Sequence, residues 1–206
     1  MPDDGTGRVT IFRASEDPED VTEQLAEFPV LYQNDVYVIT YEYDGANIIY
    51  QWIGENANSE SKSAGKELVS KAEEELEGEV NVVTVPQGKE TKHLLKILKG
   101  KVAILYGNRA DEYKADNFNN SYEDDGLRLF RVEGADFDDM RIIQVRESAK
   151  SLQDDAVLIL ETPSVVYVWN GKESNESERE MALEFTKQVV KDEREVAAIN
   201  QGEEAD

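Results

Sequence analysis

The sequence predicts an α+β fold that is present twice in the chain. The clearest copy occupies residues 154–190, where two apolar runs, Ala156–Leu160 and Val165–Trp169, flank a Thr-Pro-Ser corner. Short apolar runs bounded by turn residues are typical of β-strands. After the second run the hydrophobic period changes from 2 to 3.6, which indicates a helix. Its apolar stripe consists of Ala182, Phe185 and Val189.

The same order of elements occurs about 120 residues earlier in the chain. There, Tyr37–Tyr43 and Ile48–Trp52 predict two strands joined by a hairpin turn at Asp44-Gly45. A helical pattern follows, with apolar residues spaced by four at Ala64, Leu68, Ala72 and Leu76. Four landmarks recur at nearly one spacing: Trp52 and Trp169 (117 residues), Gly54 and Gly171 (117), Phe12 and Phe130 (118), and Asp35 and Asp155 (120). Recurrence at one period indicates a duplicated domain.

The duplication divides the chain into three parts. Residues 1–107 form the first domain, residues 108–126 a linker rich in Asn, Asp and Gly, and residues 127–206 the second domain. Domains of about 100 residues can each bury a modest hydrophobic core. The first copy continues through a short amphipathic helix over 90–98 and a strand over 102–106. The second copy stops before both, so we expect it to lack the short helix.

Composition excludes several classes of function. The chain has no cysteine and a single histidine, His93, so disulfides, thiol proteases, histidine triads and ordinary zinc sites are not expected. The formal net charge of -23 disfavours nucleic acid and anionic membranes as partners. There is no run of 18 apolar residues and no signal peptide, so we expect a cytoplasmic protein without a membrane span. The 45 acidic residues suit solubility, calcium binding or attraction to a basic partner.

One carboxylate is in an unexpected place. Glu178 lies four residues before Ala182, on the apolar stripe of the second predicted helix. A charge on the core-facing side of a helix is costly to bury unless a partner compensates it. A calcium ion is one such partner, because calcium prefers carboxylate and carbonyl oxygens. The alternatives are that Glu178 caps the helix or pairs with Arg179 or Arg194.

Short motifs mark both copies. The second copy contains Leu129-Phe130-Arg131-Val132, Asp155, Trp169-Asn170-Gly171 and Glu178-Arg179. The first copy contains Asp3-Asp4-Gly5-Thr6-Gly7, Tyr50-Gln51-Trp52-Ile53-Gly54 and Val85-Pro86-Gln87-Gly88-Lys89-Glu90. Over residues 3–204 these motifs resemble the gelsolin/villin family of actin-binding repeats. The first copy is most similar to the fourth repeat of six-repeat gelsolins, and the second to the fifth.

The resemblance implies both a fold and a function. It implies two tandem gelsolin-fold domains, each a mixed central β-sheet with a long helix on one face and a short helix on the other. It also implies a cytoskeletal, calcium-regulated actin-binding protein that caps, sequesters or severs filaments and performs no covalent chemistry. Two alternatives remain: a gelsolin-fold interaction module with a non-actin partner, and a hydrolase that uses a carboxylate pair.

The resemblance further implies a calcium site inside each copy. In the second copy the ligands are the Asp154 carbonyl, Asp155 and Glu178. In the first copy they are Asn34, Asp35 and a late carbonyl near Ala110. The helix glutamate of the first copy is replaced by Ser61, which offers one neutral hydroxyl oxygen. We therefore expect the first site to be weaker than the second.

A second kind of site is implied between the first copy and actin. Its ligands in this chain are Glu73, Gly78 and the Val80 carbonyl, with a carboxylate supplied by actin. The actin-binding face of the long helix is implied at Lys62, Lys66, Val69 and Glu73, on the side away from Leu68 and Ala72. From the residues alone, a solvated charged face is the default interpretation of such a stripe.

Overall fold

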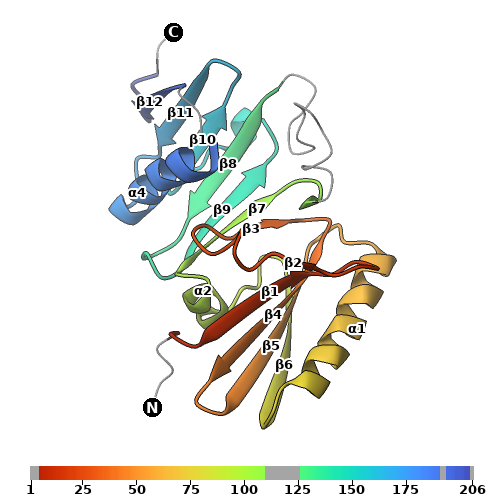
Figure 1. The fold of residues 1–206 in the computed structure, drawn as a ribbon. Coiled ribbons are helices and arrows are strands. Elements are labelled where there is room, and N and C mark those ends of the chain that lie inside the picture. Colours follow the sequence, from red (N-terminus) through yellow and green to blue (C-terminus); the bar gives the residue numbers. More distant parts are fainter. Residues whose placement is uncertain (1–4, 110–125, 191–193, 205–206) are drawn as a thin grey trace.

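The computed structural model of the protein describes residues 5–109, 126–190 and 194–204. It has the predicted α+β architecture, with two β-sheets and a long helix packed on each (Figure 1). The predicted calcium ligand at Ala110, and nearly all of the predicted linker, lie outside the described residues. Within the described residues, no helix is both long enough and apolar enough to cross a membrane.

The first copy follows the predicted order of elements. Its elements are β1 (Arg8–Arg13), β2 (Glu19–Asp20), β3 (Val30–Tyr32), β4 (Val36–Tyr43), β5 (Ala46–Ile53), α1 (Ser59–Glu75), β6 (Glu79–Pro86), α2 (Lys92–Ile97) and β7 (Lys101–Leu105). Five of these strands form one mixed sheet in the order β2-β1-β4-β5-β6. Only the β5–β6 pair is parallel, because α1 connects these two strands as a crossover.

The two faces of the five-stranded sheet are covered by different helices. Side chains alternate along β4, so Tyr37 and Ile39 face the short helix α2, whereas Val38 faces α1. The core on the α2 side is the larger one, and it includes the fully buried Trp52. The sandwich of long helix, sheet and short helix therefore has the arrangement that the sequence resemblance implies.

The second copy repeats the arrangement with fewer elements. It contains β8 (Arg128–Glu133), β9 (Met140–Val145), the 3-10 turn η1 (Ala149–Ser151), β10 (Val157–Glu161), β11 (Val165–Asn170), α4 (Glu176–Phe185), the π-helical turn η2 (Thr186–Val190) and β12 (Glu195–Asn200). Met181, Ala182 and Phe185 of α4 pack on the sheet. The described part of this copy contains no counterpart of α2, as expected.

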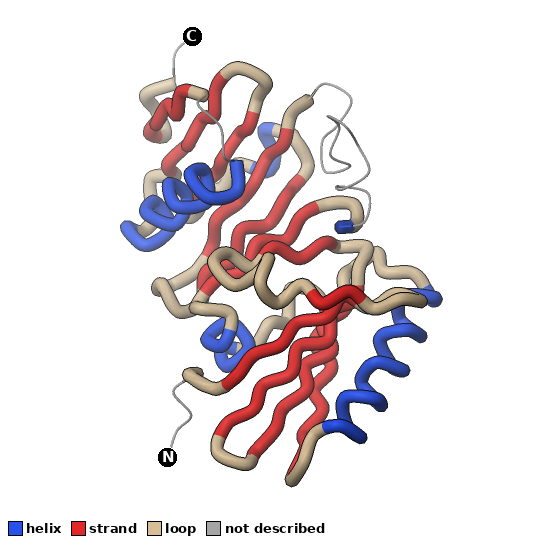
Figure 2. The backbone as a smooth tube through the Cα atoms, in the orientation of Figure 1, coloured by secondary structure: helices blue, strands red, loops and turns tan. Residues whose placement is uncertain are grey.

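The two copies share a sheet, which the sequence did not indicate. The second sheet has seven strands in the order β12-β11-β10-β8-β9-β7-β3, and its last two strands come from the first copy. β7 pairs in parallel with β9 on one side and with β3 on the other. Figure 2 shows these strands continuing one sheet across the junction. The second hydrophobic core consequently includes Phe28, Tyr32, Ala103 and Leu105 of the first copy.

Three side-chain contacts add to this junction. The ring of Phe28 meets that of Phe185 edge to face, with centroids 5.7 Å apart. Lys101 of β7 forms an ion pair with Glu184 of α4. The third contact is more deeply placed and joins Glu90 to Arg141 of β9.

Glu90 is a fully buried carboxylate at the center of a polar network. One of its oxygens accepts hydrogen bonds from Trp52 Nε1 (2.9 Å) and the Gly88 amide (2.9 Å). The other accepts from Arg141 Nε (3.1 Å). Arg141 also donates to the Glu90 carbonyl (2.9 Å), so one guanidinium holds both the backbone and the side chain of this residue.

We expect Arg141→Ala to lower the free energy of unfolding by about 3 kcal/mol, because removing one partner of a buried ion pair leaves the other charge uncompensated. The matched control is Arg8→Ala, which removes an exposed pair with Glu42 (3.7 Å) and should have little effect. Urea denaturation of both variants measures the difference. Equal losses would contradict a stabilising role for the Glu90–Arg141 contact.

Candidate functional site

The orientation of α1 on its sheet decides which of its residues are available to a partner. Gly65 and Val69 are the buried residues of this helix. A Cβ atom at Gly65 would lie 2.6 Å from Cγ1 of Val36, so only glycine permits this close packing. One turn later, Val69 packs against Val38 and Ile49. The core-facing line of α1 therefore runs through Gly65 and Val69.

The prediction that Val69 belongs to the partner-binding face is therefore wrong. Val69 is 8% exposed and part of the core, whereas Lys66 and Glu73 are exposed and Lys62 is half-buried. The apolar stripe from which the orientation was predicted lies at the margin of the core. Gly65 has no apolar side chain, so the hydrophobic pattern did not reveal that the closest approach to the sheet occurs there.

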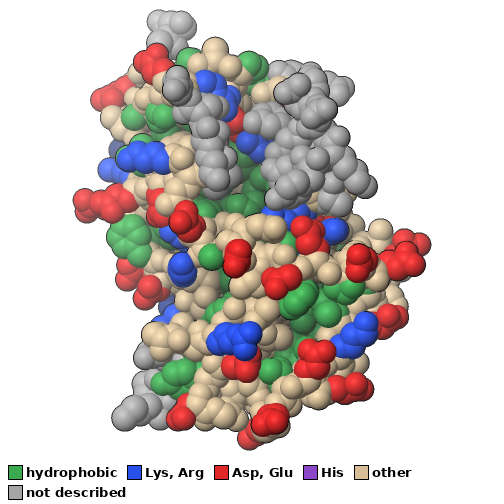
Figure 3. All heavy atoms as spheres, viewed as in Figure 1, with side chains coloured by type: hydrophobic (Ala, Val, Ile, Leu, Met, Phe, Trp, Pro, Cys, Tyr) green, Lys and Arg blue, Asp and Glu red, His purple; other side chains and the backbone are tan. Residues whose placement is uncertain are grey.

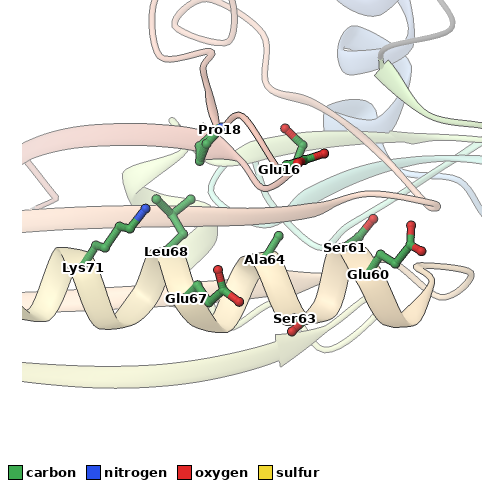
Figure 4. Close-up of a pocket in the computed structure, with 10 residues that line it drawn as sticks. Glu16, Pro18, Glu60, Ser61, Ser63, Ala64, Glu67, Leu68 and Lys71 are labelled. Atoms are coloured by element: carbon green, nitrogen blue, oxygen red, sulfur yellow. The ribbon is translucent and has the colours of Figure 1, made fainter.

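The flank of α1 that faces β1 and β2 borders a groove that sequence reasoning missed. Two adjoining hollows, of about 550 and 590 Å³, share Pro18, Leu68 and Lys71. Figure 4 shows the first hollow between the helix and the loop that carries Glu16 and Pro18. We call the two hollows together the α1 groove.

The α1 groove has an apolar floor and a mostly acidic rim. Its apolar residues are Phe12, Pro18, Val38, Ala64, Leu68, Ala72 and Leu76. Its charged residues are Arg8, Glu16, Asp20, Glu42, Glu60, Glu67, Lys71 and Glu75. In Figure 3 hydrophobic side chains gather between β1 and α1, with acidic and basic side chains around them.

The opposite flank of α1 faces β6. Each residue of an α-helix is rotated by 100° from the one before it. This rotation places Lys62, Lys66 and Glu73 on one side of the line through Gly65 and Val69, and it places Leu68 and Lys71 on the other side. Three of the four predicted partner-binding residues are thus together on one side of the helix, although the α1 groove lies on the other side.

The residues predicted for the calcium site shared with actin lie at the C-terminal end of α1. Glu73 is exposed in the last turns of the helix, and Gly78 has a left-handed backbone (φ 96°) that turns the chain into β6. Val80 follows in β6, opposite Asn47 of β5. No basic residue is present in the last helical turn, where the helix dipole favours cations. A cation or a basic partner at this end would be favourable.

In the second copy, Glu178 is buried and occupies the first turn of α4. Its Oε2 accepts a hydrogen bond from the Asn175 amide (2.9 Å), and the Asn175 side chain accepts one from the Glu178 amide (2.9 Å). This reciprocal capping box fulfils one of the alternatives considered from the sequence. The ion-pair alternatives are not realised, since Arg179 binds Ser174 and Arg194 binds Glu161.

Other carboxylates surround Glu178. Burial raises the pKa of Glu178, and the nearby charges of Asp155 and Glu133 raise it further. Hydrogen bonds from the backbone of Asn175 and Gly134 act in the opposite direction. Negative charge is thus concentrated around a buried carboxylate. A bound cation would reduce the repulsion between these carboxylates.

The Asp154 carbonyl lies beside Asp155, in the turn before β10. It accepts a hydrogen bond from the Glu173 amide (2.7 Å), and a Cβ atom at Gly171 would approach it to 2.4 Å. The donor set of Asp155, Glu178 and this carbonyl consists of hard oxygen atoms and fits calcium. Among the described residues, however, no three carboxylate or histidine side chains lie close enough together to hold a metal ion by themselves.

The strand register aligns the two copies differently, by one residue, from the spacing of their aspartates. Tyr37 is opposite Trp52, and in the second copy Leu158 is opposite the equivalent Trp169. This places Asn34, rather than Asp35, at the position of Asp155. The assumption that the two aspartates are equivalent is therefore wrong in this structure.

Asp35 is used within the first copy instead. One of its oxygens accepts hydrogen bonds from the Arg109 amide (2.9 Å) and from the Tyr37 hydroxyl (3.2 Å). Arg13 lies 3.9 Å from the other oxygen. Burial raises the pKa of Asp35, while these donors lower it. The carboxylate is already held by protein groups.

Each carboxylate around Glu178 has a neutral counterpart in the first copy. The helix caps Asn58 and Asn175 are 117 residues apart, which aligns Ser61 with Glu178. The strand register aligns Asn34 with Asp155, and the spacing of the first strands aligns Ser15 with Glu133. The first copy therefore offers a cation much less charge than the second.

Comparison with known proteins identifies the fold family. The gelsolin repeat model matches residues 19–95 and 139–205, which is one match in each copy. The chain belongs to the gelsolin-repeat family.

The gelsolin repeats of this chain are similar to those of several longer proteins. Cytoplasmic gelsolin of Homarus americanus is 37% identical over 176 residues, covering 84% of this chain and 23% of that protein. Advillin of Mus musculus is 32% identical over 90% of this chain and 22% of its own length. Gelsolin of Xenopus laevis is 32% identical over 91% of this chain and 44% of its own length. The chain thus spans less than half of each relative.

One solved structure of similar extent is the Thorarchaeota 2DGel3/rabbit actin complex. The match covers 97% of this chain and 96% of that one, with 17% identity and a TM-score of 0.37.

The first gelsolin repeat also gives a direct test of the orientation of α1. We expect Val69→Asp to destabilise the protein strongly, because it places an unpaired charge against Val38 and Ile49. The neighbouring Ser70 is exposed, so Ser70→Asp introduces the same charge without burial. Thermal unfolding of the two variants compares them. An outward-facing Val69 would make both substitutions equally mild.

Proposed function

We propose that this chain is a cytoplasmic actin-binding protein that binds actin through α1 of the first gelsolin repeat and calcium through the second repeat. The observation that carries the proposal is the exposed surface of α1. This 17-residue helix has an apolar groove on one flank and a basic and acidic stripe on the other. The gelsolin repeats of the chain support actin as the partner, because the motifs of both copies resemble those of actin-binding repeats.

The apolar floor of the α1 groove supports a protein partner rather than a small molecule. An exposed apolar hollow beside a helix is typical of an interaction site, since a partner gains free energy by covering it. The long helix can enter a cleft of the partner, where Leu68 and Ala72 would contribute apolar contacts. Lys71 on the rim, and Lys62 and Lys66 on the other flank, would contact acidic groups of actin.

Calcium would bind the second repeat through the carboxylates of Asp155 and Glu178 and the Asp154 carbonyl. Bound there, the ion would supply the positive charge that this group of carboxylates lacks. Glu178 is positioned by its capping box in the first turn of α4, and Asp155 lies in the turn that leads into β10. Glu133 would add to the negative potential that attracts the ion.

Calcium would bind the first repeat more weakly. Ser15, Asn34 and Ser61 supply no charge, and Asp35 is engaged by Tyr37 and Arg109. The acidic end of α1 at Glu73, Gly78 and Val80 would become a calcium site only together with a carboxylate of actin. Capping, sequestering and severing are all consistent with this arrangement. The alternative, a gelsolin-fold module with a non-actin partner, would use the same α1 groove.

Actin co-sedimentation and monomer binding test the proposed partner. We expect Lys62→Glu with Lys66→Glu, and separately Lys71→Glu, to weaken binding at least tenfold, because each reverses charge at the proposed contact. Lys150→Glu is the matched control, since Lys150 is an exposed lysine on η1 in the second repeat. Unchanged actin binding by the folded α1 variants would sink the assignment.

The same assay separates the remaining possibilities. Absence of wild-type binding both with calcium and with EGTA would favour the non-actin alternative. A time course of filament length after addition of calcium distinguishes severing, which shortens filaments at once, from capping and sequestering, which do not.

Thermal unfolding with and without calcium tests the metal site. A ligand that binds only the folded state raises the melting temperature by mass action. We expect Glu178→Gln to abolish most of the calcium-induced shift while keeping the capping box, because Gln also occupies this position in capping boxes. In EGTA the variant should be no less stable than the wild type at pH 7. An unaltered calcium shift in Glu178→Gln would show that the assignment is wrong.

The sign of the pH dependence follows from the raised pKa of Glu178. A carboxylate whose pKa is higher in the folded state binds a proton more tightly when folded, so it contributes stability at low pH. This contribution is lost as the pH rises from the unfolded pKa, 4.5, through the folded value. In EGTA, the wild type should therefore lose stability relative to Glu178→Gln as the pH is raised above 4.5, and calcium should reverse that loss.

The first repeat provides a gain-of-function comparison. Asn34→Asp with Ser61→Glu restores the two carboxylates that the second repeat has, and it should add a second calcium-binding event in calorimetry of the full chain. Tighter calcium binding by the wild-type first repeat than by the second would contradict the proposed order of affinities.

A further inference from the structure

The two sheets have four edges among the described strands, and these edges differ in length. β2 and β3 end their sheets with two and three residues, which is too short to recruit another strand. β12 has six residues and β6 has eight. β6 is therefore the longest open edge, and it is paired on one side only, with β5.

β6 lacks the devices that usually protect an edge strand. Native edges are blunted by lysines, prolines or bulges. β6 contains no lysine or arginine, and its eight residues pair one to one with β5 without a bulge. Its first residue is Glu79 and its last is Pro86, so the stretch between them is unprotected. Val82, in the middle of this stretch, is 42% exposed.

The charges beside β6 are polarised along the strand. α1 runs antiparallel to β6, because it is the crossover between two parallel strands. The end of β6 near Glu79 therefore adjoins the acidic C-terminal end of the helix, with Glu73 and Glu77. The end near Pro86 adjoins Lys62 and Lys89, with Glu55 as an acidic neighbour, while Lys66 lies midway along the helix.

We propose that two copies of this chain associate through their β6 strands, which pair antiparallel about a two-fold axis. Antiparallel pairing brings the acidic end of each strand to the basic end of the other, whereas parallel pairing would oppose like charges. Such a contact is isologous: both copies use the same surface, so the assembly ends at a dimer. The pairing turns two five-stranded sheets into one continuous sheet of ten strands.

The residue pairs of this arrangement are compatible. In a two-fold antiparallel pair, one residue lies opposite its own copy, and the middle of β6 places Val82 there. Asn81 is then opposite Val83, and Glu79 is opposite Val85. The only charged residue of the strand therefore does not meet a like charge. Val82 lies on the same face as Val80, which packs near Leu76 of α1, so the two Val82 side chains would cover each other.

Sedimentation velocity over a range of protein concentrations tests the proposal. The measurement is made at about 0.15 M salt, where the Debye length of about 8 Å screens the overall charge of the chains. We expect a concentration-dependent dimer of the full-length chain. Val82→Lys brings two lysines together at the axis and should raise the dissociation constant at least tenfold.

The chain offers a matched control at its other long edge. Val196 of β12 is 44% exposed, and Val196→Lys makes the same change on an edge that the proposal leaves unpaired. It should leave the dimer intact. A wild-type chain that stays monomeric at every concentration would overturn the proposal, and so would equal weakening by Val82→Lys and Val196→Lys.

A charge exchange tests the antiparallel arrangement itself. Lys62→Glu and Glu73→Lys should each weaken association, and the double variant should restore it, because residue 62 of one copy then again faces an opposite charge at residue 73 of the other. Amide hydrogen exchange provides a readout that needs no variant. Exchange in β6 should slow as the concentration rises, while exchange in β12 stays constant. Protection of β12 alone would contradict pairing through β6. No actin is present in these experiments, so their outcome is independent of the proposed function.

Discussion

The parallel pairing of β7 with β9 is the contact on which the arrangement of the two repeats depends. It places two strands of the first repeat inside the second sheet, and the second core is completed by Phe28, Tyr32, Ala103 and Leu105. α4 lies across this composite sheet. Its first turn carries Glu178 of the candidate calcium site, and its last turn carries Glu184 and Phe185 of the junction. One short helix therefore connects the metal site to the contact between repeats, over roughly 10 Å.

The repeats have diverged most where the second one gathers charge. Their helix caps, tryptophans and glycines remain equivalent, so the backbone framework is the same. At the positions equivalent to Glu133, Asp155 and Glu178 the first repeat has only neutral side chains. It retains a buried aspartate one residue further along the strand, where the Tyr37 hydroxyl and the Arg109 amide bind it. A common framework thus supports a cation site in one repeat and an internal polar network in the other.

Much of the fold was predictable because its signals are local. The change of hydrophobic period marked the step from strand to helix. The duplication followed from the spacing of Trp52 and Trp169. The inward position of Glu178 was also apparent, since a carboxylate on an apolar stripe is conspicuous.

The remaining features depend on contacts that a single sequence does not display. The rotation of α1 is determined at Gly65, where the closest packing involves no side chain of the helix. The register of β4 is set by the strands on both sides of it. This pairing makes Asn34, and not Asp35, equivalent to Asp155, which the spacing of residues along the sequence does not reveal. β7 belongs to the sheet of the second repeat because it pairs with the edge of β9, and the sequence does not show which strand it will pair with. The α1 groove forms only after the loop with Glu16 and Pro18 has folded beside the helix.

The shared sheet has a consequence for what counts as a folding unit. Although the repeats are consecutive in sequence, a chain cut between β7 and β8 would not yield two complete modules. The fragment with the second repeat would expose the edge of β9, and the fragment with the first would carry β3 and β7 without the sheet that they complete. Each fragment contains what the other lacks, so the pair should reassemble by complementation, like the halves of a split protein.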